Sequence, residues 1–316
     1  MQVIIGTKHS ADKLSNEEVH NDEGCKLGSR NIAKIPIARQ RVVAEAYAFF
    51  CKAITQTDCF PASDNLEYMR TGAWHNALVY LQNTKGLTGV SPMPLKNELN
   101  LIQQCLSQFR GNVKTAARNA VVVRTAKEKD GGMGYSAAGF YFIKSDVGNV
   151  NVQNQNSRLC ELLIEKCAFV YQNPFDTSAK GSLFRNETIQ IIINKVFFDD
   201  GGESEGLRQG FFEDEAIPLP AIALVVTAYE CALDEWKTGV HTPISFAAAR
   251  YEAKYHQHLK TLQDWHIYSQ TPTQACQTLQ KDLYWAGSVY VGAINPDGNL
   301  SLPMPTLSAS AFAVDE

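Results

Sequence analysis

Long apolar runs are missing from this sequence. No stretch of the 316 residues reaches the roughly 18 apolar residues that a membrane-spanning helix needs. The most apolar segment, 221–233, is interrupted by Thr227, Tyr229 and Glu230, which is typical of a buried helix. The opening MQVIIG is too short for the apolar part of a secretion signal, and no basic residues precede it. We therefore expect an intracellular protein, cytoplasmic or nuclear, that does not contact membranes.

A strong excess of either charge is also missing. Lys and Arg together number 29, against 33 for Asp and Glu, so the formal net charge is −4. This balance excludes a protein that binds nucleic acid through its overall charge. The chain has no internal repeat, and 45% of its residues are hydrophobic, which is typical of a globular fold with a substantial core.

The usual catalytic and metal-binding patterns are missing too. None of the eight cysteines forms a CxxC pair, and without a secretion signal we expect free thiols. There is no GxSxG or HExxH pattern. His256 and His258 are two apart on a predicted helix, so they point to different faces and cannot share a metal. The sequence therefore predicts no cofactor, and it favours a protein that is not an enzyme.

What the sequence does contain is helical periodicity. Apolar residues recur three and four positions apart through most of the chain, which predicts an all-α fold of eight or nine helices. We place these helices at 38–55, 64–85, 94–126, 159–170, 187–197, 219–236, 246–265 and 271–283. Strand content should be close to nil, with 140–143 as a short strand or a loop plug.

The most regular pattern is a heptad seam on the third predicted helix. Its members alternate at spacings of four and three: Leu95, Leu99, Ile102, Leu106, Phe109, Val113, Ala116, Ala120 and Val123. The second half of the seam is rich in alanine and suits close packing on a neighbouring helix. We interpret it as a central core helix, and the alternative is a homodimer coiled coil through residues 95–123.

Composition divides the chain into five parts. They are a flexible arm (1–30), an N-terminal helical half (31–143), a linker loop (144–156), a C-terminal helical half (157–294) and a tail (295–316). The linker is assigned from its Gly, Asn and Asp content, and the arm from its polar, aperiodic sequence.

The segment IPLPAIALVVTAYECALDEW, from Ile217 to Trp236, carries a family resemblance. Together with AFVYQNPF, YEAKYHQHLKTLQDW and CLSQFRGNVKTAAR, it resembles a large family of basidiomycete fungal proteins known only as a domain of unknown function. The resemblance covers roughly residues 60–266. It implies a fungal source and a helical domain, but no established activity, so it assigns no catalytic residue.

A basic stripe follows the long helix. Arg110, Lys114 and Arg118 are four apart, and Arg124 follows them. Such a stripe can lie along phosphates, which makes it a candidate site for nucleic acids or other anions. It has no interleaved aromatic residues. The alternatives are a solvated face or a partner for acidic groups of the same chain.

An acidic, glycine-rich segment offers such a partner. It contains Asp199, Asp200, Glu203, Glu205, Glu213, Asp214 and Glu215, with Arg208 as its one basic residue. The segment can neutralise the basic stripe by docking on it. The sharper alternative is that Asp199, Asp200, Glu203 and Glu205 hold Mg²⁺ or Ca²⁺ through their oxygens, although the spacing is not that of an EF-hand.

A third set of carboxylates lies near the end of the apolar helix. It comprises Glu230, Asp234 and Glu235. Asp234 and Glu235 are unfavourable near a helix C-terminus, so we expect cationic partners for these two. In the alternative hypothesis all three act as acid and base groups of an unfamiliar, carboxylate-lined enzyme site between the two halves. The leading hypothesis is a non-enzymatic domain that binds a protein or, through the basic stripe, a nucleic acid.

Overall fold

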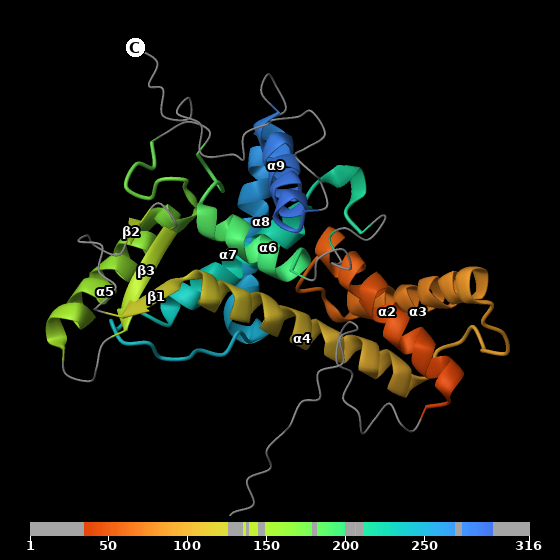
Figure 1. The fold of residues 1–316 in the computed structure, drawn as a ribbon. Helices are drawn as coiled ribbons and strands as arrows, with labels where there is room; N and C mark the ends of the chain where they lie inside the picture. Colours follow the sequence, from red (N-terminus) through yellow and green to blue (C-terminus); the bar gives the residue numbers. More distant parts are fainter. Residues whose placement is uncertain are drawn as a thin grey trace, which may run out of the picture.

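The fold is all-α, as the helical periodicity predicts (Figure 1). The structure is a computed structural model that describes residues 35–125, 135–136, 139–144, 149–178, 182–199, 206, 211–268 and 274–292. It contains eight α-helices within this part of the chain. None of these helices combines the length and the apolar composition that a membrane crossing requires. The arm at 1–30 and the tail at 295–316 lie outside the described residues.

The elements follow one another along the chain with three short strands between the third and fourth helix. Their bounds are α2 (Ile37–Gln56), α3 (Ser63–Lys85), α4 (Lys96–Ala120), β1 (Val122–Thr125), β2 (Tyr135–Ser136), β3 (Gly139–Lys144), α5 (Val150–Ile164), the 3₁₀ segment η1 (Glu165–Val170), α6 (Glu187–Phe197), the 3₁₀ turn η4 (Glu213–Glu215), α7 (Leu219–Asp234), α8 (Ala248–Tyr268) and α9 (Ala275–Tyr290).

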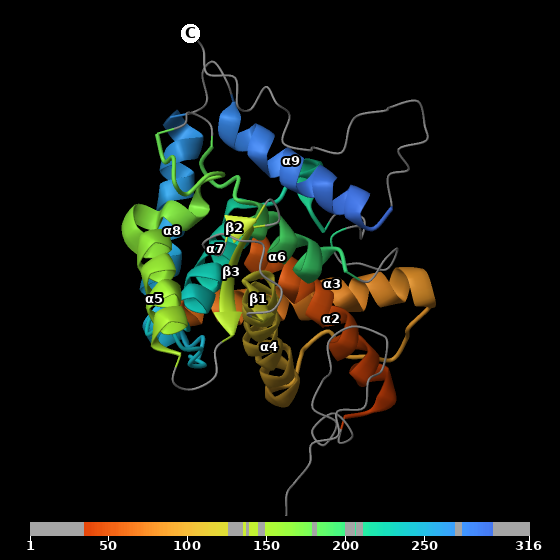
Figure 2. The same cartoon turned by 60° about the vertical axis from the view of Figure 1, so that its left-hand side comes forward.

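The core is built around α7. Every residue of this helix from Pro220 to Leu233 is buried, as its apolar circumference predicts. It packs against α2, α4, α5, α6 and α8. Figures 1 and 2 show α4 running along the molecule beneath α7, from the sheet and α5 at one end to α2 and α3 at the other.

The heptad seam of α4 faces this core. Leu99, Ile102, Leu106, Phe109 and Val113 are all buried, and α4 packs against α2, α6 and α7. The interpretation as a core helix therefore agrees with the structure. These contacts within the chain occupy most of the seam proposed for a homodimer through 95–123, so self-association would need another surface.

The predicted helix over 94–126 is too long. It ends at Ala120, and the β-branched run that follows enters a small sheet of order β1-β3-β2. Strand β1 pairs in parallel with β3, which pairs antiparallel with β2. Phe142 of β3 stacks on Trp236 with ring centroids 4.8 Å apart, so the sheet is attached to the core at the end of α7. The strands are few and short, as expected, and β3 includes the segment 140–143 proposed as a short strand or a loop plug. Strand β1 was not predicted, because local helical spacing does not show a pairing with residues 19 positions away.

Two other boundaries differ from the prediction. The linker at 144–156 is shorter, because α5 begins at Val150 after the Asn149 side chain accepts a hydrogen bond from the backbone N–H of Val152. The helix expected to continue through Cys167 instead breaks into η1, where Lys166 and Cys167 have φ values of 52° and 55°.

The two predicted halves share one continuous hydrophobic core. A single cluster of buried residues includes Phe50 of α2, Phe109 of α4, Phe197 of α6 and Leu259 of α8. The packing of α4 against α6 and α7 joins the halves directly. The predicted border at 144–156 therefore divides the sequence, but the two halves share one hydrophobic core.

Candidate functional site

Glu230, near the C-terminal end of α7, lies in a buried polar cluster between α7 and α8. Its Oε1 accepts a hydrogen bond from Nζ of Lys254 at 2.5 Å, and its Oε2 lies 2.8 Å from Nε2 of His258. Burial alone would raise the pKa of Glu230, but the hydrogen bonds from His258 and Lys254 outweigh it and lower the pKa. Glu230 is therefore an ionised partner of two groups on α8.

Asp234 lies one helical turn further along α7, on the same face. Its Oδ2 accepts a hydrogen bond from the Tyr251 hydroxyl at 3.0 Å and lies 3.2 Å from Nζ of Lys254. Lys254 thus bridges two carboxylates whose i, i+4 spacing places them side by side. The cluster holds α7 and α8 together by charge as well as by packing.

Glu235 faces α4 instead. Its fully buried carboxylate accepts hydrogen bonds from Nε and Nη2 of Arg118 at 2.8 and 2.6 Å, and Nζ of Lys114 lies 2.7 Å away. The backbone N–H of Ile244 donates at 3.0 Å, and Nε2 of His241 lies 3.1 Å away. Burial opposes ionisation, but these donors prevail and lower the pKa of Glu235 to about 2.

The basic stripe is therefore engaged within the chain. Lys114 and Arg118 bind Glu235, while Arg110 donates to the Cys59 carbonyl at 2.9 and 2.6 Å and lies over the Phe60 ring. The sequence predicts that cations neutralise the carboxylates near the end of α7, and the ion pairs of Glu235 agree with that prediction. The side chain of Arg124 lies outside the described residues.

The predicted metal ligands are not brought together in the part that is described. Asp199 lies 2.6 Å from Nζ of Lys195, four residues earlier on α6. Asp200, Glu203 and Glu205 lie outside the described residues. Among the residues that the structure describes, no group of three or more His, Cys, Asp or Glu side chains has the arrangement of a metal site.

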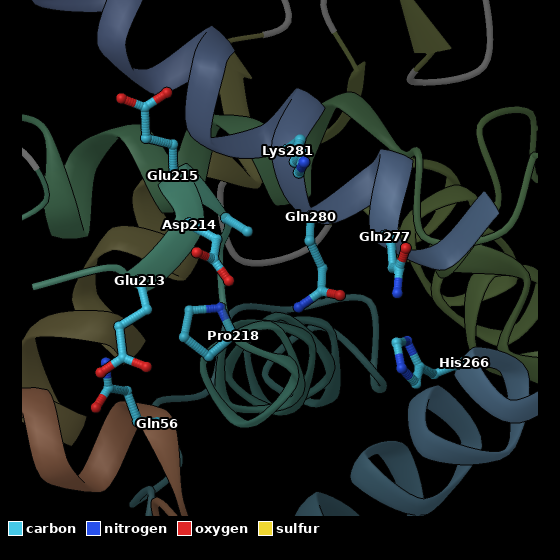
Figure 3. Close-up of a pocket in the computed structure, with 10 residues that line it drawn as sticks. Gln56, Glu213, Asp214, Glu215, Pro218, His266, Gln277, Gln280 and Lys281 are labelled. Atoms are coloured by element: carbon cyan, nitrogen blue, oxygen red, sulfur yellow. The ribbon is translucent and has the colours of Figure 1, made fainter. Parts of the chain in front are cut away.

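A hollow of about 750 Å³ opens on the other end of α7 (Figure 3). It lies between η4, the first residues of α7, the end of α8 and one face of α9, with the end of α2 at its edge. Its lining residues are Gln56, Glu213, Asp214, Glu215, Ala216, Pro218, His266, Gln277, Gln280 and Lys281. Polar side chains thus form most of the wall.

Hydrogen bonds fix the frame of this hollow. Gln280 of α9 donates to the Ile217 carbonyl at 2.9 Å, and the backbone N–H of Ile217 donates to the Gln280 carbonyl at 3.0 Å. Gln56 donates to the Phe211 carbonyl at 3.2 Å. These bonds join α2, η4, the start of α7 and α9, so the wall of the hollow is held by four separate elements.

The acidic wall of the hollow is formed by η4. Glu213, Asp214 and Glu215 are exposed, and Lys52 lies 3.6 Å from Glu213. Asp214 and Glu215 have φ values of 55° and 52°, which side chains other than glycine rarely adopt.

Sequence reasoning noted the charge of Glu213, Asp214 and Glu215 but did not find the hollow. It requires α9, which lies more than 60 residues further along the chain. No short motif marks such a site. The nearest signal was the acidic run Glu213–Glu215, which is followed by Pro218 ahead of α7.

A smaller hollow of about 200 Å³ lies next to Arg110. Phe60, Leu66, Gln103 and Glu252 contribute to its wall. Neither hollow is lined by Glu230, Asp234 or Glu235. The three carboxylates proposed as acid and base groups therefore lie away from both openings and are bonded to cations.

The comparisons with known proteins identify one family. No curated protein and no solved structure matches the chain. A family model described as a domain of unknown function (DUF6532) matches residues 45–265. This range extends from α2 to near the end of α8 and includes both polar clusters and most of the residues around the large hollow. The chain belongs to the family of this domain of unknown function.

Proposed function

We propose that the chain is a non-enzymatic protein-binding module whose large hollow receives a partner segment carrying a basic side chain. The observation that carries the proposal is the hollow of about 750 Å³, which Asp214 and Glu215 help to line and into which the Asp214 side chain points beside Pro218 (Figure 3). Gln277, which is exposed, adds an amide oxygen that can accept from the basic side chain, and the exposed Lys281 can donate only to carbonyl groups of the partner segment. Complementary charge on a partner favours fast and selective association.

Nucleic acid is a less suitable partner. Binding to phosphates requires cations that are free to exchange their counterions for the nucleic acid. Lys114 and Arg118 are paired with Glu235, and burial lowers the pKa of Arg110. The net charge of −4 adds long-range repulsion.

The enzyme alternative rests on Glu230, Asp234 and Glu235 as acid and base groups, and among these Glu230 lies between Lys254 and His258. A carboxylate between a lysine and a histidine resembles acid and base machinery, but each of its oxygens is already bonded. Such a cluster fits a structural ion-pair network at least as well. We therefore favour binding.

The proposal includes an intracellular location and, from the resemblance in the sequence, a basidiomycete fungal source. Support for the location comes from the cysteines, which form no disulfide among the described residues; Cys51, Cys59, Cys105, Cys160, Cys231 and Cys276 are buried. Free thiols of this kind are typical of reducing compartments.

Fluorescence anisotropy with short labelled peptides tests the binding proposal. We expect lysine- and arginine-containing peptides to bind the full chain, and acidic peptides of the same length not to bind. The double variant Asp214→Asn, Glu215→Gln should weaken binding by about tenfold, because it removes two charges while asparagine tolerates the left-handed backbone.

The matched control is Glu161→Gln, Glu165→Gln, which removes the same charge from exposed positions on α5 and η1. Equal weakening by both double variants would mean that overall charge and not the hollow attracts the peptide. Salt-dependent binding of a labelled oligonucleotide, with no binding of any peptide, would replace the proposal with the nucleic-acid alternative.

A further inference from the structure

One face of α3 has no partner among the described elements. Figures 1 and 2 show α3 at the edge of the molecule, and it packs against α2 and α4 on its inner side. The residues on the opposite side form what we call the α3 outer face: Asn65, Tyr68, Gly72, His75, Asn76, Val79, Gln82 and Asn83. Tyr68 is 82% exposed and Val79 is 54% exposed. Their spacing of eleven residues, three helical turns, places them in line on this face.

The α3 outer face carries no Asp, Glu, Lys or Arg side chain. Its one histidine, His75, lies near the middle of the face. The charged residues of α3 lie at its ends or turn away: Arg70 donates to Gln103 of α4 and pairs with Glu67. A face with an exposed aromatic ring, amides and few charges has the composition of a protein interface.

Gly72 has no structural role in the isolated chain. It lies inside the helix, and a Cβ atom placed there would meet nothing within 4 Å. Glycine lowers the helix propensity of such a position relative to alanine. A close approach by another backbone is one reason for glycine at an exposed helical site.

We infer that the α3 outer face is a self-association surface, on which α3 of a second copy lies antiparallel. A twofold axis near Trp74 and His75 places Tyr68 of one copy opposite Val79 of the other. The same axis brings Asn65 opposite Asn83, so amides meet amides. Gly72 lies next to the axis, where the two backbones approach most closely.

The opposite charges at the two ends of α3 favour the antiparallel orientation of the pair over the parallel one. Asp64 in the first turn and Lys85 in the last turn lie about 60° apart around the helix axis, with Asp64 at the edge of the face and Lys85 beyond it. In the antiparallel pair, the end of α3 that carries Asp64 lies beside the end that carries Lys85 in the other copy, and the helix dipoles are also opposed. In a parallel pair, Asp64 would meet Asp64. A chain with a net charge of −4 can associate with itself here because the contact face is uncharged.

The contact is limited to one helix face, so we expect a weak dimer of the small-interface class, below about 1,200 Å². This surface is separate from the hollow near α9, so failure of either proposal leaves the other intact. It also differs from the 95–123 seam, which is buried in the chain's own core.

Sedimentation equilibrium of the full chain over a range of concentrations tests the inference. We expect a reversible monomer–dimer equilibrium that Tyr68→Glu or Val79→Glu weakens by about tenfold or more, because either change buries a charge against an uncharged side chain of the other copy. The control is Met93→Glu, which adds the same charge at a 69% exposed position outside the face. A chain that stays monomeric at all concentrations would overturn the inference, as would a dimer that Met93→Glu weakens equally.

Crosslinking tests the orientation. In an antiparallel pair, a mixture of Asn65→Cys and Asn83→Cys proteins should form more disulfide-linked dimer than either protein alone, with the unsubstituted chain as the baseline. Stronger crosslinking of each single variant with itself would contradict the antiparallel arrangement. Circular dichroism of every variant confirms that helix content is retained, so loss of dimer is not loss of fold.

Discussion

At the scale of single residues, Glu235 shows how a charged side chain serves the fold. It is fully buried, and it binds Arg118, Lys114, His241 and a backbone N–H. A buried ion pair gains little over an apolar contact, but removal of one partner leaves an uncompensated charge. The arrangement therefore fixes the relative positions of α4, the end of α7 and the segment before α8.

The lowered pKa of Glu235 makes stability depend on acid pH. Its folded-state pKa of about 2 lies below the ordinary value of 4.5, so this group contributes stability that is fully present above pH 4.5 and is lost as pH falls towards 2. We expect a loss on the order of 2–3 kcal/mol across this window. Urea unfolding at a series of pH values measures it.

The variant Glu235→Gln isolates this contribution. It should lower the free energy of unfolding at neutral pH by about 3 kcal/mol, because Arg118 and Lys114 lose their anion, and it should flatten the acid dependence. Glu213 is exposed, and its Oε1 lies 3.6 Å from Nζ of Lys52. Glu213→Gln should therefore change the free energy of unfolding by less than about 1 kcal/mol. An acid dependence that is unchanged in Glu235→Gln would show that other carboxylates cause it.

The sequence predicted that the carboxylates at the end of α7 pair with cations, but it did not identify which cations these are. Carboxylates against the dipole of a helix C-terminus indicated cationic partners, and Glu235 has them. The partner of Lys114 and Arg118 was expected in the acidic segment at 199–215, yet it is Glu235, more than 110 residues away on another helix. Pairings of this kind follow from how helices pack, which charge patterns along one segment do not contain.

At the scale of elements, α7 shows what local patterns can predict. Its apolar circumference placed it correctly, because the predicted range 219–236 agrees with the observed Leu219–Asp234 to within two residues. The extension of α4 to 126 was wrong because the valines at its end pair with β3. Elements defined by their own periodicity were predictable, whereas elements defined by a distant strand were not.

The turn after α7 depends on Gly239. Its φ is 80°, and a Cβ atom there would lie 1.9 Å from the Gln153 carbonyl oxygen on α5. The Gly239 carbonyl also accepts a hydrogen bond from Asn156 at 3.0 Å. We expect Gly239→Ala to lower the free energy of unfolding by about 2–3 kcal/mol through strain and displacement of α5.

Thermal unfolding followed by circular dichroism measures this effect, and Gly111→Ala is the control. Gly111 lies in α4 with nothing within 4 Å of its Cβ position, so alanine should be neutral or stabilising by up to about 1 kcal/mol. Equal effects at the two glycines would mean that the close contact between the turn and α5 is absent in solution.

At the scale of the whole molecule, the continuous core has consequences for unfolding. Residues from both predicted halves belong to one buried cluster, and α4 contacts α6 and α7. The composition of residues 144–156 indicated a boundary, but loop composition shows where the chain is irregular and does not show where packing ends. The hydrophobic core therefore predicts one cooperative unit in place of two.

The variant Phe109→Ala tests whether the two halves unfold as one cooperative unit. Phe109 lies on α4 in the N-terminal half, and its ring centroid is 6.1 Å from that of Phe197 on α6 in the C-terminal half. Truncation should cost about 3–5 kcal/mol and lower the protection of amide hydrogens in α2, α7 and α8 by the same amount. Leu162→Ala, at a 37% exposed site, should cost much less. Two calorimetric transitions would contradict unfolding as a single cooperative unit. Loss of amide protection confined to α2, α3 and α4 would also contradict it, because the cavity left by Phe109→Ala would then destabilise only the N-terminal half.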